Sequence, residues 1–146
     1  MRLRDQMPEF ESTTDWLNSH PIQKNDLVGD KPTLIHFWSV SCDLCTRAMP
    51  KINQIRDTYH PHLNVIAVHM PRSDEDQDIN RVQEVASAHD ISQPIYLDQD
   101  HILTDIYKNR YVPAYYVFDE MGILRHFQAG AGGMIMLEKR IKRVLN

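Results

Sequence analysis

The chain has 146 residues, of which 42% are hydrophobic and 25% are charged, and its net charge is −4. This length suits a single domain over residues 1–146 with a sizeable core, and both shares are ordinary for a soluble globular protein. The acidic balance and the lack of a basic block exclude nucleic acid as an expected partner and argue against binding to a membrane surface. No segment approaches the roughly 20 apolar residues that a membrane-spanning helix needs.

The first 30 residues are weakly patterned and are interrupted by Pro8, Pro21 and Gly29. No apolar run follows the first arginines, so the start of the chain lacks the features of a signal peptide. We therefore expect a cytoplasmic protein, with this segment as an N-terminal extension that packs over the core.

Apolar periodicity predicts alternating strands and helices in the rest of the chain. Residues 33–38 form a short run of aromatic and branched residues, which indicates a buried strand. From Leu44 to Tyr59 apolar residues recur every three or four positions, which predicts a helix that Pro50 should kink. The further predicted elements are strands at 63–70 and 94–97, helices at 79–89 and 103–107, a hairpin of 114–118 and 123–128, and a final helix at 134–145. This order predicts an α/β fold with parallel strands and an antiparallel edge.

The two cysteines of the chain, Cys42 and Cys45, lie where the first strand passes into the first long helix. Residues three apart on a helix are neighbours about 5–6 Å apart, which disulfide geometry accepts. Unpaired N–H groups and the helix dipole should lower the pKa of Cys42, whereas Cys45 should be more buried. The neighbouring carboxylate of Asp43 would offset part of this effect.

The residues alone leave three interpretations of this pair open. The first is redox chemistry, because in a signal-less chain two close cysteines are more often catalytic or metal-binding than a structural cross-link. An inert pair of core cysteines is the second possibility. A zinc site is the third, with His60 and His62 as the best further ligands, and thiolates also suit Cu(I).

The sequence around the pair resembles the thioredoxin superfamily, in its TlpA/ResA-like thiol–disulfide oxidoreductase branch. The match consists of FWSVSCDLC at 37–45, Pro50, YVPAYYVFD at 111–119 and Gly122, and it extends over residues 31–146. The resemblance implies a thioredoxin fold, in which helices flank a central mixed sheet. It implies disulfide exchange that needs no organic cofactor, and we expect no metal. The expected cytosolic location favours the reducing direction. Copper or zinc handling by the same cysteines is the alternative function.

The resemblance also implies roles for individual residues. Cys42 would be the nucleophile, Cys45 the resolving thiol and Pro113 a cis-proline facing the disulfide. The backbone of Val112 would pair with an extended substrate, and Trp38 would line the approach to the nucleophile. The alternatives are a trans proline that starts a strand and a plain core tryptophan. The implied partners are proteins that contain disulfides and an upstream reductant such as a thioredoxin system, and we expect a monomer.

The chain departs from the family pattern at three places. His36 stands where thioredoxins carry a buried aspartate; we expect a core histidine, although a neutral imidazole could relay a proton. Asp43 and Leu44 replace glycine and proline between the cysteines, so the redox potential of thioredoxin does not transfer. Residues 71–73 stand where some cytochrome-maturation members carry a functional glutamate, which argues against a role in reducing haem apoproteins.

The remaining polar residues are interpreted as structural or solvent-exposed. They include the scattered histidines, His69 among them, and the acidic stretch at 74–76, which we interpret as a solvated loop. Ser73 or Asp78 should cap the helix that follows this loop.

Overall fold

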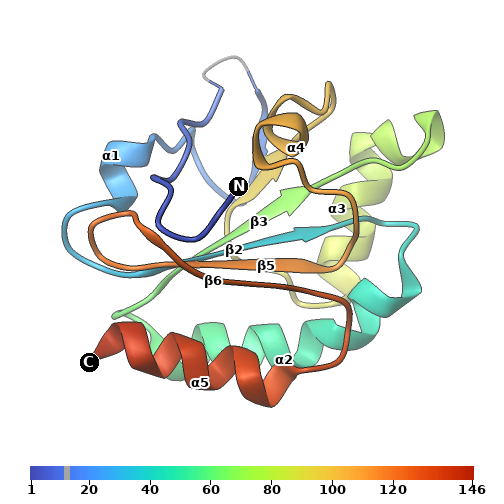
Figure 1. The fold of residues 1–146 in the computed structure, drawn as a ribbon. Coiled ribbons are helices and arrows are strands. Elements are labelled where there is room, and N and C mark those ends of the chain that lie inside the picture. Colours follow the sequence, from blue (N-terminus) through green and yellow to red (C-terminus); the bar gives the residue numbers. More distant parts are fainter. Residues whose placement is uncertain (12–13) are drawn as a thin grey trace.

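The structure is a computed structural model that describes residues 1–11 and 14–146 (Figure 1). Its strands are β1 (Trp16–Leu17), β2 (Thr33–Trp38), β3 (Asn64–His69), β4 (Ile95–Leu97), β5 (Ala114–Phe118) and β6 (Leu124–Ala129). Its helices are α1 (Lys24–Leu27), α2 (Asp43–Tyr59), the 3-10 helix η1 (Asp74–Gln77), α3 (Ile79–Ala88), α4 (Ile102–Tyr107) and α5 (Met134–Leu145). The elements predicted after residue 31 are confirmed, with ends that shift by single residues.

The six strands form one mixed sheet in the order β1-β4-β3-β2-β5-β6. Strands β2, β3 and β4 are parallel, whereas β1, β5 and β6 are antiparallel to their neighbours. The predicted combination of parallel strands with an antiparallel edge is therefore confirmed. Because β2 lies between β3 and β5, the residues that follow its carboxyl end are close to the end of β3 and the start of β5.

Side chains that alternate along the central strand divide the core into two layers. Leu34 and Trp38 of β2 pack with α2, α3 and α5, whereas Ile35 and Phe37 pack with α4 and the N-terminal segment. Figure 1 shows α2 and α5 beneath the sheet, with the N-terminal segment and α4 above it. No helix among the described residues is long and apolar enough to cross a membrane.

The N-terminal extension covers one face of the sheet. The backbone N–H groups of Arg4 and Met7 donate to the carbonyl oxygens of Leu124 and Gly122, each at 2.8 Å. The side chains of Met7 and Phe10 are buried in the layer above the sheet. Burial of an apolar side chain of this size contributes about 1.5–3 kcal/mol, so the extension is part of the folded core.

Helix α2 differs from its prediction at the first turn. Its buried stripe includes Cys45, whereas Leu44, which we expected in that stripe, is 50% exposed. At 3.6 residues per turn, Leu44 falls at the margin of the stripe and Cys45 lies nearer its centre. Pro50 lies within the helix on an exposed position, and the helix continues past it to Tyr59.

Candidate active site at the start of helix α2

The two cysteines form a disulfide at the point where β2 passes into α2. Cys42 caps the helix and Cys45 lies in its first turn, with 5.3 Å between their Cα atoms. The backbone N–H of Cys45 donates to Sγ of Cys42 at 3.1 Å. In the reduced protein this N–H and the helix dipole would favour a thiolate at Cys42. Only 4% of Cys42 and 1% of Cys45 is exposed, so burial distinguishes the two thiols weakly in the oxidised form.

The segment before β5, far from the cysteines in the sequence, lies next to the disulfide. The Val112–Pro113 peptide bond is cis, and the carbonyl oxygen of Val112 lies 3.8 Å from Sγ of Cys42. The strand register brings this segment to the cysteines, because Phe37 near the end of β2 pairs with Ala114 at the start of β5. The cis bond that the resemblance implied is present. The roles of Pro113 and Val112 toward a substrate stay predictions.

Trp38 lies inside the core instead of on the surface. Its side chain is completely buried, belongs to the apolar layer that contains both cysteines, and packs edge-on against His69 with ring centroids 5.1 Å apart. A side chain without exposed surface cannot contact a substrate at the surface of this form. Contact between Trp38 and a substrate stays a prediction, and its burial favours the alternative of a core tryptophan.

The loop before the disulfide is held by a buried carboxylate that the sequence analysis missed. Asp76 is 1% exposed, so the interpretation of residues 74–76 as a solvated loop is wrong at this position. Its Oδ2 accepts hydrogen bonds from Ser41 Oγ at 2.6 Å, from the Arg72 backbone N–H at 2.9 Å and from Ser39 Oγ at 3.0 Å. Burial would raise the pKa of Asp76, but these hydrogen bonds outweigh it and lower the pKa below its ordinary value. Both serines of the Ser39–Ser41 loop are therefore tied to a charged group.

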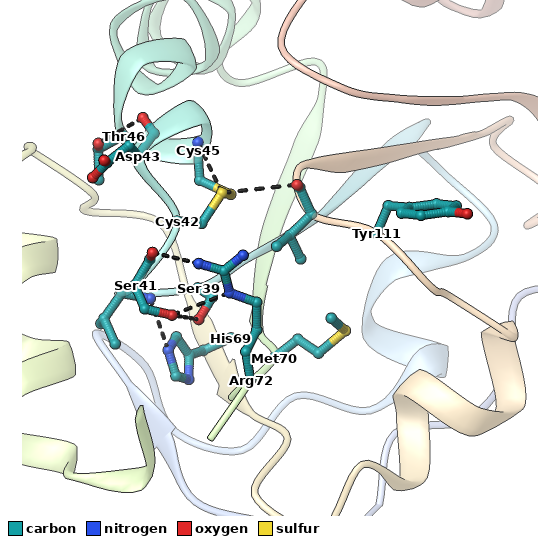
Figure 2. The surroundings of a disulfide bond; sticks show 12 residues. Ser39, Ser41, Cys42, Asp43, Cys45, Thr46, His69, Met70, Arg72 and Tyr111 are labelled. Carbon is teal, nitrogen blue, oxygen red and sulfur yellow. Dashed lines mark hydrogen bonds between the residues drawn. A yellow bond between two sulfur atoms is a disulfide. The ribbon is translucent and has the colours of Figure 1, made fainter. Parts of the chain in front are cut away.

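Arg72 holds the same loop from the solvent side. Its Nε donates to Ser41 Oγ at 3.1 Å, and its Nη2 donates to the Ser41 carbonyl oxygen. Figure 2 shows the guanidinium reaching toward Ser41 beneath the disulfide. The Ser41 carbonyl belongs to the peptide bond whose nitrogen is that of Cys42. Arg72 therefore donates to the peptide group directly before Cys42. Sequence reasoning did not identify this contact.

His69 also contributes to this loop. Its Nε2 accepts the backbone N–H of Val40 at 3.2 Å, and its Nδ1 has no hydrogen-bond partner among residues 1–11 and 14–146. Burial lowers the pKa of His69 to about 4, with the charge of Asp76 acting in the opposite direction and that of Arg81 adding to the effect. The imidazole is therefore neutral near pH 7. The prediction of a structural histidine fits this position, but it did not anticipate contact with the active-site loop.

His36, which replaces the aspartate of thioredoxins, is a buried neutral histidine. Its Nε2 lies 3.0 Å from Nε2 of Gln93, whose Oε1 accepts from Arg56 at 2.6 Å. Because the amide nitrogen is a donor, the imidazole nitrogen is the acceptor. Burial and the nearby Arg56 lower the pKa of His36 to about 3. In the described part of the chain no hydrogen bond joins this histidine to either cysteine, so it has the core position that we expected.

The structure gives no support to a metal site at the cysteines. His60 and His62 follow the last residue of α2, whereas Cys42 precedes the first. This helix has 17 residues, which at 1.5 Å per residue separates its ends by about 25 Å. The suggested zinc site that combines these residues is therefore wrong. Across the described ranges, no group of three or more histidine, cysteine, aspartate or glutamate side chains could hold a metal ion.

Comparison with known proteins identifies the family. Residues 3–127 match the AhpC/TSA family. The chain belongs to the AhpC/TSA family. It is 59% identical over 145 residues to the thiol-disulfide oxidoreductase YkuV of Bacillus subtilis, a match that covers 99% of this chain and 97% of YkuV. It is also 36% identical over 143 residues to the protein DipZ of Mycobacterium tuberculosis, but this match covers only 20% of DipZ.

A solved structure shows the same fold. The solution structure of a thioredoxin-like protein in its oxidized form matches with a TM-score of 0.91 at 59% identity, covering 99% of this chain and 97% of the other. The thioredoxin-like fold is therefore confirmed. Together with the family and the cysteine pair at disulfide distance, the identity to YkuV confirms the predicted class, a thiol–disulfide oxidoreductase.

Proposed function

We propose that this AhpC/TSA-family chain reduces disulfides of cytoplasmic proteins, acts as a monomer, and is itself reduced by an upstream dithiol donor such as a thioredoxin system. The observation that carries the proposal is the Val112 carbonyl 3.8 Å from Sγ of Cys42. A backbone acceptor beside the reactive sulfur suits an extended peptide that carries the target disulfide. The reducing direction depends on the proposed cytosolic location, where the glutathione poise keeps thiols reduced.

The exchange balances with the two cysteines alone. The Cys42 thiolate attacks one sulfur of the substrate disulfide, which forms a mixed disulfide and releases the other sulfur as a thiolate. Cys45 then attacks Sγ of Cys42, which breaks the mixed disulfide and forms the Cys42–Cys45 disulfide. Two electrons and two protons pass from the dithiol to the substrate. The Cys45 N–H, which donates to Sγ of Cys42, would stabilise the thiolate before the attack.

Reduction of insulin by dithiothreitol tests the proposed activity. The wild-type chain should accelerate precipitation of the insulin chains, and Cys42→Ser should precipitate them at the rate of dithiothreitol alone. Equal rates for the two proteins would contradict the proposal.

The direction of exchange is tested by equilibrating the chain with glutathione redox buffers. A potential at or below the cytosolic glutathione poise of about −220 to −260 mV supports a reductase. A potential near −120 mV, which is typical of a strong oxidant, would contradict this direction. Sedimentation at 17.1 kDa supports a monomer, and twice that mass would contradict it.

A further inference from the structure

We propose that Arg72 determines which disulfides this chain prefers, by binding a carboxylate next to the target cysteine in the substrate. The inference rests on the proposed exchange at Cys42. It adds a substrate class, namely disulfides that are flanked by aspartate or glutamate.

The guanidinium of Arg72 is anchored and still has donors to spare. Two of its nitrogens, Nε and Nη2, donate to the hydroxyl and carbonyl oxygens of Ser41. A guanidinium carries five N–H donors in a rigid fork that matches the geometry of a carboxylate. The side chain is exposed, so donors that Ser41 does not use are open to a bound molecule.

Arg72 forms no direct ion pair among residues 1–11 and 14–146, although its Nε and the Asp76 carboxylate share the Ser41 hydroxyl. Its two acceptor atoms on Ser41 are uncharged. The nearby carboxylate of Asp76 accepts the backbone N–H of Arg72 and has Arg81 as its ion-pair partner at 3.7 Å. None of the ion pairs among the described residues includes Arg72. The guanidinium is therefore open to a direct ion pair with a bound carboxylate, although the nearby charge of Asp76 weakens its field.

The position of Arg72 places this charge where a substrate must lie. A target disulfide can react only when it contacts Sγ of Cys42. Arg72 is hydrogen-bonded to the peptide group that precedes Cys42. The acidic neighbour, Asp43, lies beside Thr46 on the other side of the disulfide from Arg72 in Figure 2. A bound peptide would thus meet the cation on the loop side of the cysteine.

Anchoring also makes the contact more favourable. A side chain that is already held by Ser41 and by the Asp76-bound backbone loses less freedom when it binds a ligand. An exposed ion pair of this kind changes a rate about two- to fivefold, and salt screens the effect.

The test uses two synthetic peptides that differ only in charge. Each carries one cysteine as a mixed disulfide with 2-thiopyridine, flanked on both sides by aspartate in one peptide and by asparagine in the other. The reduced chain attacks the peptide sulfur and releases 2-thiopyridone, whose absorbance gives the rate. Rates are normalised to those of 2-mercaptoethanol, an uncharged thiol that corrects for the intrinsic reactivity of each peptide.

The wild-type chain should prefer the aspartate peptide about two- to fivefold at low salt. Arg72→Gln should abolish this preference, Arg72→Lys should keep part of it, and Arg72→Glu should reverse it. Arg143→Gln is the matched control, because it removes one positive charge near the end of α5, far from the end of β2 in Figure 1. This control should keep the wild-type preference.

Equal normalised rates for the two wild-type peptides, or an unchanged preference in Arg72→Gln, would overturn the inference while leaving the exchange activity in place. Failure of the exchange itself gives a different result. In that case neither peptide would react with the wild-type chain faster than with Cys42→Ser, and both proposals would be overturned.

Discussion

Replacing Asp76 by asparagine should destabilise the fold and disturb the active-site loop. Asparagine keeps the shape of the side chain but loses the charge and one acceptor oxygen. In the structure the carboxylate accepts three hydrogen bonds, from the hydroxyls of Ser39 and Ser41 and from the backbone N–H of Arg72. Each of these becomes weaker or is lost in the variant.

The size of the effect follows from burial and charge. A hydrogen bond to a charged group contributes about 1.5–3 kcal/mol, against about 0.5–1.5 kcal/mol for a neutral pair. Ser41 and Arg72 are exposed and can bind water instead, whereas Ser39 is completely buried. We therefore expect Asp76→Asn to lower the free energy of unfolding by about 2 kcal/mol. Asp76→Ala should cost about 3 kcal/mol, because it removes the carboxylate acceptor of the buried Ser39 hydroxyl and leaves that hydroxyl only Ser41 Oγ, at 3.3 Å.

The difference in unfolding free energy between wild type and Asp76→Asn should also depend on pH. The pKa of Asp76 in the folded chain lies below its ordinary value of 3.8. A carboxyl group of this kind contributes stability that is present above its unfolded pKa and is lost as the pH falls through its folded pKa. Asparagine does not titrate. The gap between wild type and Asp76→Asn should therefore be constant from about pH 7 to pH 5 and shrink below about pH 4.

Urea unfolding of the oxidised proteins, followed by tryptophan fluorescence, measures this gap at each pH. Asp119→Asn is a control for the loss of one carboxylate, since Asp119 lies in the β5–β6 turn instead of the active-site loop. In the insulin assay Asp76→Asn should be slower than wild type, and Asp119→Asn should not. An Asp76→Asn protein within about 0.5 kcal/mol of wild type at pH 7 would refute the inferred role of the carboxylate.

The other predictions concern the two buried histidines, the contact between helices α2 and α5, and the two thiols. Burial lowers the pKa of His36 to about 3 and that of His69 to about 4, so the unfolded chain binds more protons below about pH 6.5. Unfolding free energy should fall from about pH 7 to pH 4, and His36→Gln should flatten that slope; a slope equal to wild type would contradict the assignment. Tyr59→Phe removes the 2.5 Å hydrogen bond to Glu138 and should cost about 1 kcal/mol in urea unfolding without changing insulin reduction, whereas slower reduction would be evidence against a purely structural role. In the reduced chain, iodoacetamide should modify Cys42 before Cys45 in peptide mapping, and the reverse order would exclude the predicted thiolate.

Local patterns were sufficient to predict most of the sheet. The hairpin of β5 and β6 is an example, because its turn chemistry is contained in a few adjacent residues. The carboxylate of Asp119 accepts the backbone N–H groups of Met121 and Ile123, each at 3.0 Å, and Gly122 adopts a φ of 78° that favours glycine. Such contacts are encoded within the segment itself, so periodicity and turn residues predict them.

Elements that depend on distant partners were not predictable in the same way. Strand β1 has only two residues, too few for a periodic signal, and it exists because Trp16 pairs with Tyr96 of β4. Phe10 completes this cluster, with ring centroids 5.3 Å from Trp16 and 5.5 Å from Tyr96. The sequence suggested only that the N-terminal segment packs over the core.

The residues of the site likewise fall into those that the sequence predicts and those that only the fold brings together. Cys42, Cys45 and the cis-peptide position at Pro113 could be inferred because their residue types and spacing resemble a known family. Asp76 and Arg72 could not, because both lie in a polar stretch with the composition of a solvated loop. Their contacts with Ser41 cross more than 30 residues of chain, and only the fold brings these segments together.

The most direct test of disulfide exchange at this site is the formation of a mixed disulfide with insulin. Cys45→Ser, mixed with insulin and analysed by intact mass, should accumulate a covalent adduct with an insulin chain that dithiothreitol releases. Cys42→Ser should form none, and the double variant is the background control. Equal adducts in both single variants, or none in Cys45→Ser, would contradict Cys42 as the nucleophile and Cys45 as the resolving thiol.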